Sequence, residues 1–239
     1  MVLAMLAAAP LVLAAAGCSD DKKSAASTTP PATSSSATPP PNYSMEQVKA
    51  GLIAAKDIRP DVREIDVALR ELKDGRVPVC SLSGFKLPTD PETTERQFAN
   101  STKGPKQYVH AQLIARYQEA KDASSDFEIL KKKAKACPSK QKVAPKKVGE
   151  NRTAYAHDDT WRVEEGVQEG WGHLRGIEQQ TIDRASSKYN VYHFTYDYAL
   201  RGNLLVTTLS IERTEPKESG APITKRATEV LVKQLKKFG

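Results

Sequence analysis

The sequence predicts an α+β fold, an antiparallel twisted sheet with flanking helices, in a single domain that follows a signal peptide and a disordered tether. Residues 1–17 form an uncharged apolar run that ends at a cysteine. A segment rich in Ala, Ser, Thr and Pro follows. From residue 43 onward, helical spacings and strand-like alternation share close to 200 residues, which is enough for one buried core.

The first segment, MVLAMLAAAPLVLAAAG, carries no charge and is short for a permanent span, which needs about 20 apolar residues. Small residues 15–17 precede Cys18, an arrangement that resembles the bacterial lipobox. We therefore expect residues 1–17 to be a lipoprotein signal peptide, with Cys18 lipidated after cleavage and the protein held on the extracellular face of the cell membrane. The alternatives are an ordinary secretory signal or an uncleaved anchor, and both also place the domain outside the cytosol.

Residues 18–42 are expected to be the lipidated cysteine and its tether. The stretch SAASTTPPATSSSATPPPN within it has no charged residue and no large apolar one. Such a composition cannot bury a core, so it predicts disorder. Residues 43–239 then form the folded domain.

The first half of the domain mixes helical and extended signals. Residues 44–56 fit a helix, because Ser44 can cap an apolar stripe. Residues 62–72 fit a strand or a helix, and residues 78–85 read as extended. Residues 88–106 are rich in Thr, Pro and Gly, which predicts a loop.

The second half has clearer periodicity. Alternation over residues 108–117 predicts a strand, and spacings of three and four over residues 120–137 predict an amphipathic helix that ends at Cys137. A loop rich in Lys and Pro comes next. The remaining expected elements are strands at 160–167, 171–181, 189–200 and 204–213, a hairpin turn at Arg201 to Asn203, and a helix at 223–238.

Two cysteines remain in the domain, Cys80 and Cys137. In an oxidising exterior they most simply form one disulfide, which closes a loop of about 57 residues and stabilises by roughly 4 kcal/mol. The alternative is a pair of buried free thiols. Two isolated cysteines without a nearby His pair do not suggest a metal site.

Three short motifs resemble the PknH-like extracellular sensor domain of actinobacterial lipoproteins and some membrane kinases. They are GLIAAKDI near the domain start, DFEILKKKAKACP in the central helix and YALRGNLLVTT at the late hairpin. The resemblance covers most of residues 44–239. It implies an antiparallel sheet with flanking helices around a cleft for an extracellular ligand, and no enzymatic activity.

Aromatic residues offer a candidate ligand-binding groove. One face of the strand at 189–200 is crowded with aromatics, and tryptophans occur on both preceding strands. Such side chains could line a groove for a sugar or an apolar ligand, or they could simply be the core side of a sheet. The candidate residues are Trp161, Trp171, Tyr192, Phe194 and Tyr196.

The charge balance suggests a second kind of partner. Lys and Arg total 36 against 29 Asp and Glu, a formal net charge of +7. Basic residues cluster in the central helix and the following loop, and the candidates for polyanion binding are Lys131, Lys132, Lys133, Lys135, Lys146 and Lys147. Outside a cell, the partners of such a patch are phospholipid headgroups or anionic wall polymers, whereas nucleic acid is excluded by compartment. The alternative is a solvated face.

Catalytic signals are weak. The four histidines are scattered without metal-ligand spacing, and there is no GxSxG, SxxK or P-loop motif. His157, beside Asp158 and Asp159, could orient a base toward a serine, but such adjacency is common in polar loops. We therefore expect no metal, no cofactor and no enzymatic activity.

These observations favour a membrane-anchored extracellular lipoprotein with a sensor or ligand-binding domain. One alternative is a structural envelope lipoprotein that binds anionic wall polymer. The other is a secreted hydrolase of unknown substrate. The ligand, any partner protein and the oligomeric state have no signature in the sequence.

Overall fold

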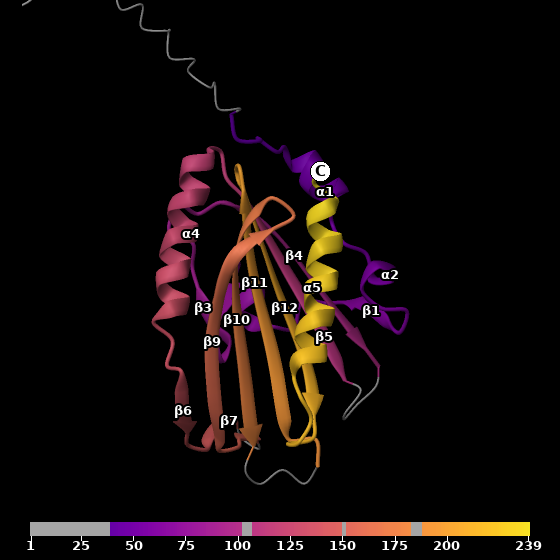
Figure 1. Cartoon of the computed structure of the whole chain (residues 1–239), viewed down its shortest axis with the longest axis vertical. Helices are drawn as coiled ribbons and strands as arrows, with labels where there is room; N and C mark the ends of the chain where they lie inside the picture. Colours follow the sequence, from indigo (N-terminus) through magenta and orange to yellow (C-terminus); the bar gives the residue numbers. More distant parts are fainter. Residues whose placement is uncertain (1–38, 102–106, 150–151, 183–187) are drawn as a thin grey trace, which may run out of the picture. The chain divides into compact units, whose positions relative to one another are not determined.

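An eight-stranded antiparallel sheet dominates the part of the chain that the computed structural model describes, which is residues 39–101, 107–149, 152–182 and 188–239 (Figure 1). The strand order is β1-β4-β5-β12-β11-β10-β9-β6. Helices α4 and α5 run alongside the long central strands. The predicted α+β class is confirmed. The predicted signal peptide, Cys18 and most of the tether lie outside the described residues.

The elements follow one another along the chain with short connections. The helical elements are α1 (Met45–Ala50), α2 (Ala55–Ile58), α3 (Arg70–Lys73), the 3-10 turn η1 (Cys80–Leu82), α4 (Ala120–Lys135) and α5 (Ala221–Lys236). The large sheet contains β1 (Val62–Ile65), β4 (Glu92–Asn100), β5 (Tyr108–Arg116), β6 (Lys140–Val143), β9 (His157–Gln168), β10 (Trp171–Ile182), β11 (Val191–Arg201) and β12 (Leu204–Thr214). Two small hairpins are formed by β2 (Val77–Val79) with β3 (Ser83–Phe85), and by β7 (Lys146–Gly149) with β8 (Arg152–Ala154).

The predicted hairpin between β11 and β12 is confirmed. Gly202 turns the chain with a left-handed φ of 57°, a conformation that glycine adopts without steric cost. Asn203 then fixes the turn, because its amide donates to the carbonyls of Tyr43 and Tyr117 and its Oδ1 accepts from the Tyr43 N–H. The start of the domain is thereby held at the tip of this hairpin.

One face of the sheet, here called the α4 face, packs against α4 and the β2–β3 hairpin. Apolar residues of α4 at spacings of three and four are buried, among them Phe127, Leu130 and Ala134. They meet the aromatic side chains of β9 and β11, and the Trp161 indole N–H donates to the Ala134 carbonyl at 2.9 Å. This cluster is the largest core of the domain.

The opposite face, here called the α5 face, is covered by α5 and α1. The buried side of α5 includes Leu231 and Leu235, which pack with Trp171 and Phe238. Trp171 is completely buried. Because side chains alternate along a strand, each long central strand contributes to both cores.

Several long elements match their expected positions within three residues. These are β5, α4, β9, β10, β11, β12 and α5. The ambiguous region 62–72 resolves into β1 followed by α3. Long, strongly periodic elements therefore show clearly in the sequence.

The loop expected at residues 88–106 is wrong, because it contains the nine-residue strand β4. The strand is mostly polar and half-buried, so it lacks the apolar alternation that identifies a strand. Backbone pairing with β1 on one side and β5 on the other holds it in the sheet. The loop expected after Cys137 likewise contains the short strands β6, β7 and β8.

The single helix expected at residues 44–56 is also wrong, because it is split into α1 and α2. The Gln234 side chain of α5 reaches across the break. Its Nε2 donates to the Gly51 carbonyl at 2.7 Å, and its Oε1 accepts from the Ile53 N–H at 3.0 Å. These backbone groups are therefore satisfied by a tertiary contact in place of helical hydrogen bonds.

Candidate functional site

A hollow of about 260 Å³ opens on the α4 face, and no residue of α4 lines it. Its walls come from β5, β11 and β12, from η1 and from the residue just before β5. We call it the aromatic hollow, and its lining residues are Leu82, Gln107, Val109, Tyr192, Phe194, Ile211 and Arg213. The lining is mainly apolar with a few polar groups, as in many small-molecule sites.

The aromatic side of the hollow continues the core of the domain. Tyr192, Phe194 and Tyr196 stack in a row along β11, with ring centroids 6.4 and 6.3 Å apart. Tyr196 is fully buried, Phe194 nearly so, and Tyr192 only partly. The stripe therefore begins as core and ends as the wall of an open site.

Arg213 supplies the charge. Its guanidinium lies 4.5 Å from the Tyr192 ring centroid, and its Nε donates to the Tyr189 carbonyl at 3.0 Å. The cation–π contact and the hydrogen bond together fix its position. Of the residues that the structure describes around the hollow, Arg213 alone carries a charge.

The wall opposite the sheet is the η1 turn. Ser81 and Leu82 both have a φ of 53°, in the left-handed region that residues other than glycine rarely adopt. The Ser81 N–H donates to Glu178 Oε2 at 2.8 Å, and the neighbouring Cys80 forms a disulfide with Cys137 at the end of α4. The predicted disulfide is confirmed, and it holds the strained turn beside the hollow.

Two buried acids lie behind this turn. Burial raises the pKa of Glu178, even though the Tyr196 hydroxyl donates to it at 2.7 Å. Burial likewise raises the pKa of Asp159, which accepts from the Ser81 hydroxyl at 3.2 Å. The turn is therefore held by acids whose ionised forms are disfavoured by their surroundings.

The residues that suggested a hydrolase do not form a relay. His157 Nε2 lies 3.4 Å from Asp159 Oδ1, while the Ser81 hydroxyl binds the other oxygen of the same carboxylate. A serine nucleophile needs the imidazole between itself and the acid, whereas in this chain the acid lies between them.

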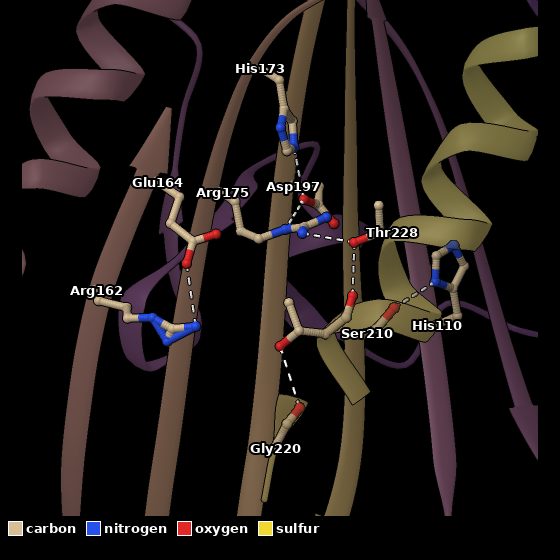
Figure 2. A network of polar contacts seen from close by, with 10 residues as sticks. His110, Arg162, Glu164, His173, Arg175, Asp197, Ser210, Gly220 and Thr228 are labelled. Carbon is tan, nitrogen blue, oxygen red and sulfur yellow. Dashed lines mark hydrogen bonds and ion pairs between the residues drawn. The ribbon is translucent and has the colours of Figure 1, made fainter. Parts of the chain in front are cut away.

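The other histidines serve buried contacts. His110 Nδ1 and the Ser210 hydroxyl are 3.1 Å apart, but both residues are buried under α5 and cannot meet a substrate (Figure 2). His193 pairs with Thr214. His173 belongs to a separate polar network.

That polar network occupies the middle of the α5 face (Figure 2). Asp197, which is completely buried, accepts from His173 at 2.8 Å and from Arg175 at 2.7 Å, and Arg175 also donates to Thr228 of α5 at 2.8 Å. Burial acts to raise the pKa of Asp197, but the hydrogen bond from His173 and the charge of Arg175 outweigh it and hold the pKa below its usual value. Burial lowers the pKa of nearby His110 to about 4.

The structure separates the five aromatic candidates. Trp161, Tyr192, Phe194 and Tyr196 share the α4 face, and Tyr192 and Phe194 line the hollow. Trp171 does not join them, because it packs on the α5 face, with its ring 6.2 Å from that of Tyr43. The cause is strand parity, which turns side chains an odd number of residues apart to opposite faces.

The six lysine candidates divide into two groups. Lys131 pairs with Glu128 at 3.0 Å and with Glu165, and Lys135 also pairs with Glu165. The others are exposed and, in the described part of the chain, have no ion-pair partner: Lys132, Lys133, Lys146 and Lys147. Polyanion binding stays a prediction.

Sequence reasoning missed five residues of the hollow. They are Leu82, Gln107, Val109, Ile211 and Arg213. The hairpin turn could have identified two of them, because it pairs Tyr192 with Arg213 and Phe194 with Ile211. Leu82 comes from a distant turn, for which the sequence has no comparable signal.

Across the described residues, no group of three or more His, Cys, Asp or Glu side chains is arranged to hold a metal ion. None of the described helices combines the length and apolar character needed to cross a bilayer.

Comparison with known proteins finds a similar fold. No family model matches the chain, and no curated protein matches it. The extracellular domain of PknH from Mycobacterium tuberculosis has a solved structure that is similar, with a TM-score of 0.50 and 11% sequence identity over 82% of this chain and 98% of that one. At this identity the likeness shows the fold alone, so the predicted resemblance to PknH-like domains is confirmed for architecture.

Proposed function

We propose that this chain is an extracellular, lipid-anchored binding module without enzymatic activity, and that its aromatic hollow takes a small, largely apolar ligand. The observation that carries the proposal is the hollow itself. It keeps Tyr192 partly exposed beside a row of stacked aromatics, and no residue of α4 covers it there.

The lining suggests the ligand's character. Removing apolar surface from water is favourable by about 25 cal/mol per Å². An apolar ligand that packs against Tyr192, Phe194 and Ile211 therefore owes most of its affinity to buried apolar surface. Arg213 favours a negative group at the rim. A volume of about 260 Å³ is at the small end for ligand sites, which suits a compact molecule.

The proposed location rests on three supports. The uncharged leader ends at Cys18. The disulfide between Cys80 and Cys137 is of the kind that persists in oxidising compartments. The similar solved structure is an extracellular domain.

A structural envelope protein is the second candidate. Lys132 and Lys133 on α4 and Lys146 and Lys147 on β7 are exposed, and no described acid neutralises them. Such a basic surface would bind an anionic wall polymer with an affinity that falls as salt rises. A hydrolase is less favoured because the acid separates Ser81 from His157.

The anchor is tested by the intact mass of the protein recovered from native membranes. A chain that begins at Cys18 and carries a diacylglyceryl or triacyl adduct would support the location. A chain that retains Met1, without an adduct, would contradict both the anchor and the assigned face of the membrane.

The hollow is tested with 1-anilinonaphthalene-8-sulfonate, an aromatic anion, added to the mature protein. Tyr192→Ala should raise the dissociation constant of the dye, measured from a fluorescence titration, about tenfold, the equivalent of about 1.4 kcal/mol of lost contact. The matched control is Tyr155→Ala, since Tyr155 is 61% exposed and does not line the hollow. Equal weakening in both variants, or in neither, would contradict the proposed site.

A further inference from the structure

A second hollow, of about 320 Å³, opens on the α5 face, where α5 begins. We call it the polar hollow. Its walls come from β9, β10 and β11 and from residues 219–224. Its lining includes Arg162, Gln179, His193, Thr195, Ser219 and Gly220.

His193 is the clearest sign of an unfilled site. The residue is 5% exposed, and its Nε2 contacts the Thr214 hydroxyl at 2.8 Å. Its Nδ1 has no hydrogen-bond partner among the described residues. Burial lowers the pKa of His193, which favours the neutral ring. In a neutral ring, Nδ1 can either donate or accept one hydrogen bond.

Gly220 lies close to this nitrogen. A Cβ built at position 220 would lie 2.6 Å from His193 Nδ1. The backbone does not require glycine at this point, because φ is −74° and ψ is −8°, a conformation open to any residue. The glycine is therefore explained by the close approach of the start of α5 to the His193 ring, which a side chain at position 220 would displace.

Thr195 adds a hydroxyl to the polar groups of the hollow. It is 1% exposed and lines the hollow, yet its side chain has no hydrogen-bond partner in the described part of the chain. The Gln179 amide offers a further donor and acceptor on the neighbouring strand.

The charged and N–H groups around the polar hollow argue against an anionic ligand. Arg162 is paired with Glu164 at 3.3 Å (Figure 2). The start of α5 has few free N–H groups, because the Ala221 N–H donates to the Ser219 hydroxyl, residue 222 is proline, and the next two N–H groups bind the Gly220 carbonyl. The positive end of the helix is thus already satisfied.

We propose that the polar hollow is a binding site for a small uncharged ligand rich in hydroxyl groups, of the size of a single sugar ring. His193, Thr195 and Gln179 form its hydrogen bonds, and Ile177 offers an apolar side. The site is on the opposite face of the sheet from the aromatic hollow and does not depend on it.

The experiment titrates the mature, ¹⁵N-histidine-labelled protein with N-acetylglucosamine and follows the imidazole resonances of His193. We expect a saturable shift with a dissociation constant on the order of 1 mM, as suits a few hydrogen bonds. Gly220→Ala should weaken binding about tenfold or more, because the added methyl group would clash with the His193 ring and displace it. Gly166→Ala is the matched control, since a Cβ there meets nothing within 4 Å.

Thr195→Val keeps the proposal testable if the glycine variant misfolds. The substitution keeps the shape and removes one hydroxyl that has no described partner, so thermal unfolding should hold or rise while binding weakens about tenfold. No shift of His193, or unchanged binding in both hollow variants, overturns the site. Tighter binding of glucose 6-phosphate than of N-acetylglucosamine overturns the uncharged ligand.

Discussion

On the α4 face the buried centre of the sheet is aromatic and aliphatic, whereas on the α5 face a salt-bridged network occupies the same strands. Tyr196 and Asp197 are neighbours in β11, and both are completely buried, yet one enters the apolar core and the other binds Arg175. An apolar core tolerates small shifts of its side chains, but a buried charged group is strongly destabilising when its ion-pair partner is displaced. We infer that the centre of the α4 face depends mainly on apolar packing and the disulfide, whereas the centre of the α5 face depends on fixed polar contacts in addition to its apolar core.

The largest expected effect concerns the disulfide on the α4 face. Replacing both cysteines, Cys80→Ser with Cys137→Ser, should lower the free energy of unfolding by about 4 kcal/mol, because the bridge closes a loop of 57 residues. Urea unfolding of the mature protein measures the loss. A loss well under about 1 kcal/mol would show that packing alone holds the η1 turn and that the bridge is dispensable for it.

The next effect concerns pH and the α5 face. The pKa of His110 falls from 6.5 to about 4 on burial, so the folded state disfavours the charged ring. The stability that His110 contributes is complete above pH 6.5 and is lost as pH falls toward 4, by up to about 3 kcal/mol. His110→Gln, which cannot titrate, should flatten this part of the curve of unfolding free energy against pH.

The matched control is His157→Gln, because His157 lies at the start of β9, beside Asp159 and between β6 and β10. An identical dependence of stability on pH in wild type and His110→Gln would contradict the proposed role of buried polar groups on the α5 face.

The smallest expected effect concerns the exposed outside of α4, which belongs to neither core. Lys132→Gln with Lys133→Gln should leave thermal unfolding unchanged, since no described acid pairs with them. Retention on immobilised polyphosphate should fall if this surface binds polyanions. Unchanged retention would remove the support for the structural envelope alternative.

The elements most visible in the sequence were those with one dominant period. The stripe of α4 and the alternation of β11 and β12 follow from burial on one side of each element. The sequence does not indicate β4, because this strand is stabilised by backbone pairing with β1 and β5 and lacks the apolar alternation that identifies a strand. The break between α1 and α2 depends on Gln234, which is 181 residues from Ile53, so the local sequence pattern cannot contain it.

The aromatic hollow, like the fold, could be predicted only in part from the sequence. Tyr192 and Phe194 lie on a recognisable aromatic face, and the Gly202–Asn203 turn fixes which residues oppose them. Trp171 lies on the opposite face from the other aromatic candidates, and its side of the sheet depends on the register of β10 with β11, which the sequence of β10 alone does not contain. His193 and Gly220 meet only through the fold, so neither stands out in the sequence.

The hydrogen bonds between Asn203 and Tyr43 have a mechanical consequence. Tyr43 is held by three backbone hydrogen bonds with Asn203 and Arg116, and its ring sits between Trp171 and Phe238. The Pro41 carbonyl also lies against Gly202, and the C-terminus ends beside α1 (Figure 1). A pull on the chain before Tyr43 should therefore load the tip of the β11–β12 hairpin and the residues that end α5 together, because Tyr43 contacts both.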